Sequence, residues 1–74
     1  MNMSNKPYNY SELLGRIKAK ELTQEELARI IKLNPSTLNL KLNNKSEFSQ
    51  SEIRNICNAV DIPYSDIAIY FFAI

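Results

Sequence analysis

The sequence predicts an all-α protein, a small domain of five helices, and helix-start signals are the first observation behind this prediction. In three places a capping residue is followed three positions later by glutamate, the pattern of a capping box: Asn9 with Glu12, Thr23 with Glu26, and Ser49 with Glu52. Asn34-Pro35 and Ile62-Pro63 mark two further starts, because proline suits the first helical turn. Seventy-four residues are the length of one small domain.

Apolar residues spaced three and four apart are the second observation. They place the helices at about residues 10–20, 24–31, 35–42, 50–60 and 63–71. The expected core residues, in helix order, are Leu13, Leu14 and Ile17; Leu27, Ala28, Ile30 and Ile31; Leu38 and Leu42; Ile53, Ile56, Cys57 and Val60; and Ile67, Tyr70 and Phe71. Phe48 is expected to fill the core beneath the loop between the third and fourth helices.

The segment at 38–42 carries leucine at every second position, which is also typical of a half-buried strand. A strand there would have no partner strand in the chain, and its backbone groups would stay unsatisfied. A helix is therefore expected, with Leu38 and Leu42 facing the core. Leu40 then lies on the opposite, exposed face.

Composition argues against several functional classes. The chain has no histidine and a single cysteine, Cys57, so neither a metal site, a cofactor site, a disulfide nor an activated nucleophile is expected. The chain is therefore expected not to be an enzyme. No signal peptide is expected, because residues 1–12 are polar and lack an apolar run. No membrane span is expected either, because the C-terminal run IAIYFFAI is far shorter than the roughly 20 residues that cross a bilayer. A soluble, cytoplasmic protein is the expectation.

Charge is unevenly distributed along the chain. Residues 13–45 carry seven lysines and arginines against three glutamates, whereas residues 46–74 carry one arginine against four acidic residues. A basic first half is compatible with nucleic-acid binding. It is equally compatible with an ordinary solvated surface.

Two short predicted helices, 24–31 and 35–42, are joined by a tight turn. Ala28 is small enough for the two helix axes to approach closely, and Leu33 and Leu38 would fill the angle between them. This arrangement indicates a helix-turn-helix, in which the second helix enters the major groove of DNA.

The residues of this unit resemble a known family. Residues 23–31 (TQEELARII) followed by 33–38 (LNPSTL) look like the Xre/Cro-type helix-turn-helix. With 8–18 (YNYSELLGRIK), 38–48 (LNLKLNNKSEF) and the ending from 61 to 72, they resemble small phage and prophage Cro-like regulators of Gram-positive bacteria. The resemblance implies one small five-helix lambda-repressor-like domain at residues 8–74, a flexible N-terminal arm at 1–7, and a location in the bacterial host cytoplasm.

The sequence departs from that family at two turns. Glycine is common in the family at the positions held here by Glu21 and Lys32, where a left-handed backbone is favoured. We expect either that these residues adopt the left-handed conformation at a cost of about 1 kcal/mol, or that the turns differ slightly.

The resemblance also implies which residues contact DNA. The expected base-contacting residues are Ser36, Thr37, Asn39 and Leu40, and the expected backbone-contacting residues are Gln24, Lys41, Asn43, Asn44 and Lys45. Leu40 would contact a thymine methyl group. The alternatives for Leu40 are an incidental surface leucine or a contact with a protein partner.

Two functions remain open at this point. The first is a sequence-specific DNA-binding regulator, a Cro-like repressor that inserts residues 35–42 into the major groove of a double-stranded operator. The alternative is an antirepressor or corepressor module that binds a larger phage repressor. The apolar tail at 70–74 is expected either to fold back on the first helix or to form a homodimer contact.

Overall fold

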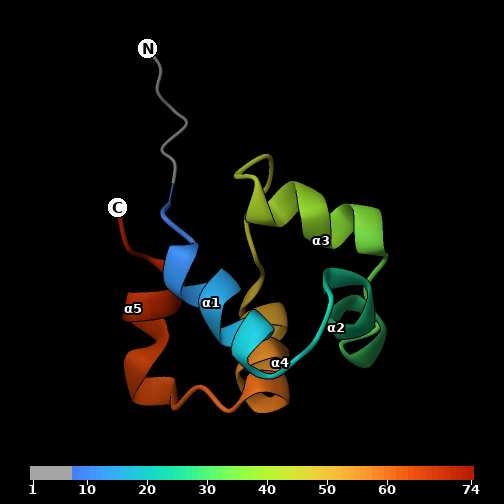
Figure 1. Ribbon diagram of the computed structural model, residues 1–74. Coiled ribbons are helices and arrows are strands. Elements are labelled where there is room, and N and C mark those ends of the chain that lie inside the picture. The colour runs from blue at the N-terminus through green and yellow to red at the C-terminus, as the bar shows by residue number, and fades with distance from the viewer. Residues whose placement is uncertain (1–7) are drawn as a thin grey trace.

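The computed structural model describes residues 8–74, so the arm expected at residues 1–7 lies outside the described residues. The helices are α1 (Ser11–Ala19), α2 (Gln24–Ile30), α3 (Pro35–Leu42), α4 (Gln50–Val60) and α5 (Ile67–Phe71), with a short 3-10 turn, η1 (Tyr64–Asp66), before α5. Residues 8–74 contain no strand, which confirms the all-α prediction and the helical assignment of 35–42. Figure 1 shows α2 and α3 on one side of the molecule and α5 on the other.

Three of the predicted helix starts have the expected chemistry. The Thr23 hydroxyl accepts from the Glu26 N–H at 3.0 Å, and the Glu26 carboxylate accepts from the Thr23 N–H at 2.8 Å. Ser49 and Glu52 form the same reciprocal pair at the start of α4. Asn34 accepts from the Ser36 N–H at 2.8 Å, with Pro35 at the first helical position of α3. These caps fix where α2, α3 and α4 begin.

The first and last helix starts differ from the prediction. No capping box forms at Asn9, because α1 begins at Ser11 and the Asn9 side chain instead accepts from the Ser11 N–H at 2.9 Å in a local turn. The last helix begins as the 3-10 turn η1 and becomes α-helical only at Ile67. The first and last helices thus each begin later in the sequence than the pattern predicts.

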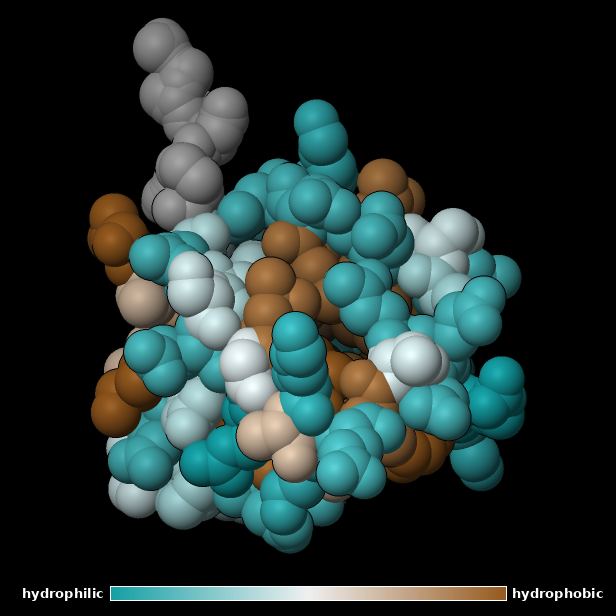
Figure 2. All heavy atoms as spheres, in the orientation of Figure 1, coloured by the Kyte–Doolittle hydropathy of each residue, from teal (hydrophilic) through white to brown (hydrophobic). Residues whose placement is uncertain are grey.

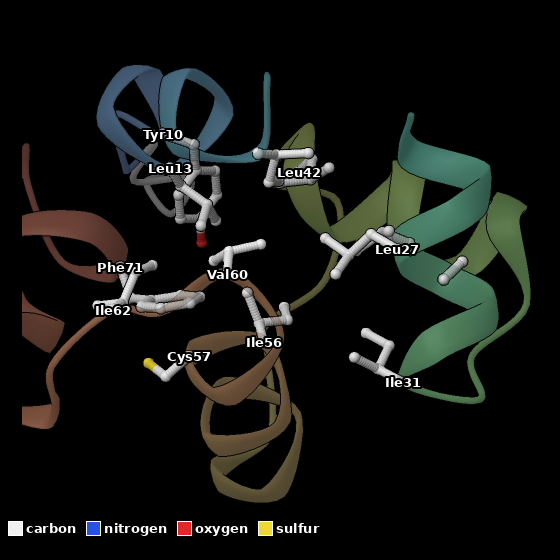
Figure 3. Packing of buried hydrophobic residues seen from close by; sticks show 13 residues of the cluster. Tyr10, Leu13, Leu27, Ile31, Leu42, Ile56, Cys57, Val60, Ile62 and Phe71 are labelled. Carbon is white, nitrogen blue, oxygen red and sulfur yellow. The ribbon is translucent and has the colours of Figure 1, made fainter. Parts of the chain in front are cut away.

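A single core cluster joins the five α-helices (Figure 3). Its buried members are Tyr10, Leu13, Ile17, Leu27, Ala28, Ile31, Leu38, Leu42, Ile56, Cys57, Val60, Ile62 and Phe71. Figure 3 shows Phe71 from α5 beside Ile62 and Cys57. Leu27 and Leu42 lie on the other side of the cluster. Burial raises the pKa of the Cys57 thiol, which fits a small hydrophobe rather than a reactive group.

Two predicted core residues are wrong. Leu14 is 41% exposed and Ile30 is 54% exposed. In α1 the core takes Leu13 and Ile17, four residues apart, and Leu14 lies about 100° around the helix from Leu13. In α2 the core takes Leu27 and Ala28, and Ile30 stays outside it, at the edge of a surface groove that α4 also lines.

The C-terminal tail is partly folded back. Phe71 is buried, and its ring packs edge-on against Phe48, which in turn packs edge-on against Tyr10. The Asn9 N–H donates to the Ala73 carbonyl at 2.7 Å, which holds the last residues beside the start of α1. Phe48 therefore packs against the core as predicted, although it is only partly buried, whereas Phe72 and Ile74 remain exposed.

Both turns that lack the family's glycine keep the left-handed backbone. Glu21 and Lys32 each have φ of 60°, so the first of the two expectations is confirmed. Asn44 and Asp61 adopt the same conformation at the ends of α3 and α4. Asparagine and aspartate tolerate it best among residues other than glycine.

An arginine ties the end of α4 to α1 and α5. Arg16 donates to the Val60 and Asp61 carbonyls at 3.2 and 2.7 Å and to the Tyr70 hydroxyl at 2.9 Å. Lys20 pairs with the Asp61 carboxylate at 2.6 Å, and this hydrogen bond lowers the pKa of Asp61. Arg16 on α1 and Lys20 directly after it are thus both occupied in holding the fold. No helix in residues 8–74 is both long and apolar enough to cross a bilayer.

Candidate interaction surface on α3

The outer face of α3 is the candidate functional surface. Leu38 and Leu42 point into the core, so the opposite side of this short helix meets solvent. Ser36, Asn39 and Leu40 are exposed on it, and Thr37 is half-buried. Leu40 is 49% exposed, which confirms the predicted helix phase. Figure 2 shows a hydrophobic side chain protruding among polar ones at the side that carries α3.

A chain of amide side chains runs along this face. The Asn39 amide donates to the Gln24 side chain at 3.4 Å, a long hydrogen bond that links the start of α2 to α3. The Asn43 amide donates to the Asn39 carbonyl at 2.8 Å and to the Asn39 side chain at 3.2 Å. Gln24, Asn39 and Asn43 are therefore brought together, and they hold each other in place.

Lys41 is turned away from the outer face. Its ammonium donates to the Glu47 carbonyl at 2.8 Å and pairs with the Glu52 carboxylate at 3.2 Å, and its side chain is only 12% exposed. Partial burial would raise the pKa of Glu52, but hydrogen bonds from the Ser49 N–H and Lys41, together with the lysine's charge, outweigh burial and lower it. Lys41 thus serves mainly to join α3 to the start of α4.

Asn44 is also engaged within the fold. Its side-chain oxygen accepts from the Tyr8 N–H at 2.9 Å, and its amide donates to the Tyr8 carbonyl at 3.0 Å. Both polar atoms of the side chain are satisfied by one residue of the N-terminal segment. The left-handed backbone of Asn44 ends α3 at this point.

The residues expected to contact DNA phosphates therefore offer little free positive charge. Among Gln24, Lys41, Asn43, Asn44 and Lys45, only Lys45 has a side chain without a polar partner in residues 8–74. Phosphate binding to DNA depends on such cations. The exposed face of α3 thus offers a leucine and small polar side chains, and one unpaired lysine, Lys45, lies in the turn after the helix.

Two open grooves lie elsewhere on the surface. The first, of about 460 Å³, has a mixed polar and apolar lining of Ile30, Ile31, Lys32, Asn55, Asn58 and Ala59. The second, of about 330 Å³, lies between α4 and α5 and is lined by Gln50, Ile53, Arg54, Tyr64, Ile67 and Phe72. Neither groove is apparent from the sequence, although Phe72 of the apolar tail lines the second. No cluster of His, Cys, Asp or Glu in residues 8–74 is placed to hold a metal ion.

Comparisons with known proteins give two findings. The model of a protein family described as a protein of unknown function, DUF739, matches residues 6–74. The solution structure of the modulator of repression (MOR) of the temperate bacteriophage TP901-1 from Lactococcus lactis is similar, with 38% sequence identity and a TM-score of 0.76. The alignment covers 88% of this chain and 88% of that one. The search of curated proteins found no match.

Proposed function

This chain belongs to the DUF739 family, and we propose that it is a phage regulator that acts by binding a larger phage repressor protein. Its likeness to a modulator of repression, at 38% identity over most of both chains, supports the regulatory role. A modulator of repression can act by binding either the repressor or its operator. The chemistry of the α3 face favours the repressor.

The observation that carries this choice is the composition of the outer face of α3. Lys41 and Asn44 are engaged with Glu52 and Tyr8, so they have little left to offer to phosphates. Leu40 stands exposed among uncharged side chains instead. Burying a leucine completely gains roughly 1.5–3 kcal/mol, so burying its exposed half against a protein would gain about 1 kcal/mol.

Operator binding by a Cro-like protein is the second candidate. It is favoured by the close α2–α3 pair, in which Ser36, Thr37 and Leu40 face outward from a helix of the right length for a major groove. In this case Leu40 would contact a thymine methyl group, and Lys45 would be the cation still available among the predicted phosphate contacts. The roles of the nine predicted contact residues stay predictions under either candidate.

Fluorescence anisotropy separates the two candidates. Labelled DNA flanking the gene is titrated with this protein alone, with a repressor from the same phage or prophage, and with both, at several salt concentrations. We expect little binding by the protein alone and a changed affinity of the repressor for DNA when both are present. Tight binding by the protein alone that weakens steeply with salt would instead establish operator binding as its function.

Leu40→Glu tests the surface, and Leu14→Glu is its matched control. Both leucines are roughly half exposed, but Leu14 lies on α1 and outside the proposed interface. We expect Leu40→Glu to abolish the effect on the repressor with an unchanged melting temperature, and Leu14→Glu to keep the effect. If both variants behave alike, the α3 face is not the interface.

A further inference from the structure

The groove between α4 and α5 forms a second interaction surface, separate from the face of α3. We propose that it is the contact between two copies of this chain, related by a two-fold axis, in a weak homodimer that leaves both α3 faces open. This inference goes beyond the proposed function and does not depend on it. It rests on the shape, charge and position of the groove.

Apolar side chains dominate the groove and its edge. Ile53 from α4 faces Ile67 and Phe72 from the C-terminal segment, and Tyr64 stands at the turn between the two helices. Tyr64, Phe72 and the neighbouring Ile69 are each about half exposed. Figure 2 shows hydrophobic side chains projecting at the edge of the molecule where α5 and the last residues lie. The same surface thus has both a hollow and protruding side chains, as a self-complementary contact requires.

Charges of both signs lie at the groove and on the turn that borders it. Arg54 lines it and Asp66 lies on η1, between the lining residues Tyr64 and Ile67. Neither side chain has an ion pair or a hydrogen bond in residues 8–74. In a two-fold contact residue i of one copy meets residue j of the other, and j meets i. Arg54 of each copy would therefore pair with Asp66 of the other.

The size of the surface sets the strength of the contact. Large aromatic side chains bury about 150–250 Å² each, so the half-exposed Tyr64, Phe72 and Ile69 together contribute on the order of 200–400 Å² per copy. Stable specific interfaces bury about 800 Å² per partner. We therefore expect a dimer that dissociates at micromolar concentrations rather than a permanent one.

The position of the groove would let the dimer present both of its α3 faces to partners. α3 and α5 lie on opposite sides of the molecule (Figure 1), so a contact through α5 leaves α3 uncovered. Two outward α3 faces in one particle would engage two copies of a partner, or two sites on one partner, and raise the apparent affinity without any new contact at α3.

Charge reversal tests the pairing directly. Arg54→Asp places two like pairs in a homodimer, and Asp66→Arg does the same with the opposite sign. When the two variants are mixed, both pairs across the two-fold contact become opposite again. Sedimentation velocity of the wild type, each variant and the mixture, from about 5 µM to about 1 mM, measures the result. Lys18→Asp is the control, because Lys18 is an exposed cation on α1 that does not line the groove.

We expect wild type and Lys18→Asp to dimerise, each groove variant to shift at least tenfold toward monomer, and the mixture to recover the dimer. Circular dichroism should show all variants folded, and Ile69→Glu offers a further disruption at an exposed residue. A wild type that stays monomeric at about 1 mM, or a mixture that fails to recover, would overturn the proposal. A monomeric wild type whose repressor binding is lost in Arg54→Asp would assign the groove to the repressor instead.

Discussion

Lys32→Gly should make the protein more stable, although it removes a side chain. Lys32 has φ of 60°, is exposed, and makes no polar side-chain contact in residues 8–74. The left-handed conformation costs an L-residue about 1–2 kcal/mol, and glycine avoids that cost. Glycine also gives the unfolded chain more freedom, which costs about 0.4–1 kcal/mol. The net expectation is a gain of about 0.5–1 kcal/mol in the free energy of unfolding, with the left-handed cost outweighing the entropy.

The assay is thermal and urea denaturation followed by circular dichroism. A gain of this size should raise the melting temperature by about 2–8 °C in a domain of this length. Lys18→Gly is the matched control, because Lys18 is also exposed but lies within α1. There glycine should cost about 0.8–1 kcal/mol. If Lys32→Gly destabilises the protein as Lys18→Gly does, the turn after α2 is not left-handed and the reasoning fails.

Two further outcomes concern α3 and its link to α4. Leu38→Ala removes a fully buried side chain and should cost roughly 2–5 kcal/mol in urea denaturation, whereas an unchanged midpoint would place Leu38 outside the core. In Glu52→Gln, the free energy of unfolding should fall less steeply as the pH is lowered into the acid range. The pKa of Glu52 is lowered in the folded state, so its contribution is complete above the ordinary value of 4.5 and is lost as the pH falls through the folded value. Equal acid slopes for the wild type and Glu52→Gln would contradict the Lys41–Glu52 pair.

The helices could be predicted because their signals are local. A capping box needs only residues three positions apart, and the boxes at Thr23 and Ser49 form as expected. Leu40 could be assigned to the exposed face from its spacing to Leu38 and Leu42 alone. Ile30 could not be assigned correctly, because spacing identifies an apolar stripe but not how many neighbouring helices cover it.

The surface was harder to predict because its chemistry depends on distant partners. Lys41 resembles a free basic residue at the end of α3 until Glu52 is placed beside it. Asn44 finds its partner, Tyr8, 36 positions away. Pairings of this kind follow from the packing of whole helices, which no short pattern contains. The groove beside Arg54 likewise exists only once α4 and α5 are packed together.

The contacts of Asn44 with Tyr8 and of Asn9 with Ala73 lie outside every helix. The first joins the N-terminal end of the described chain to the turn that closes α3, and the second joins the two ends to each other. We expect these contacts to break together in a local opening that costs little free energy, while the helices stay intact. Hydrogen exchange would detect such an opening. A force or a ligand that draws the last residues away from the body would therefore also loosen the hold of Asn44 on Tyr8. The amides of Tyr8 and Asn9 would then lose protection together, well before those of α3 itself.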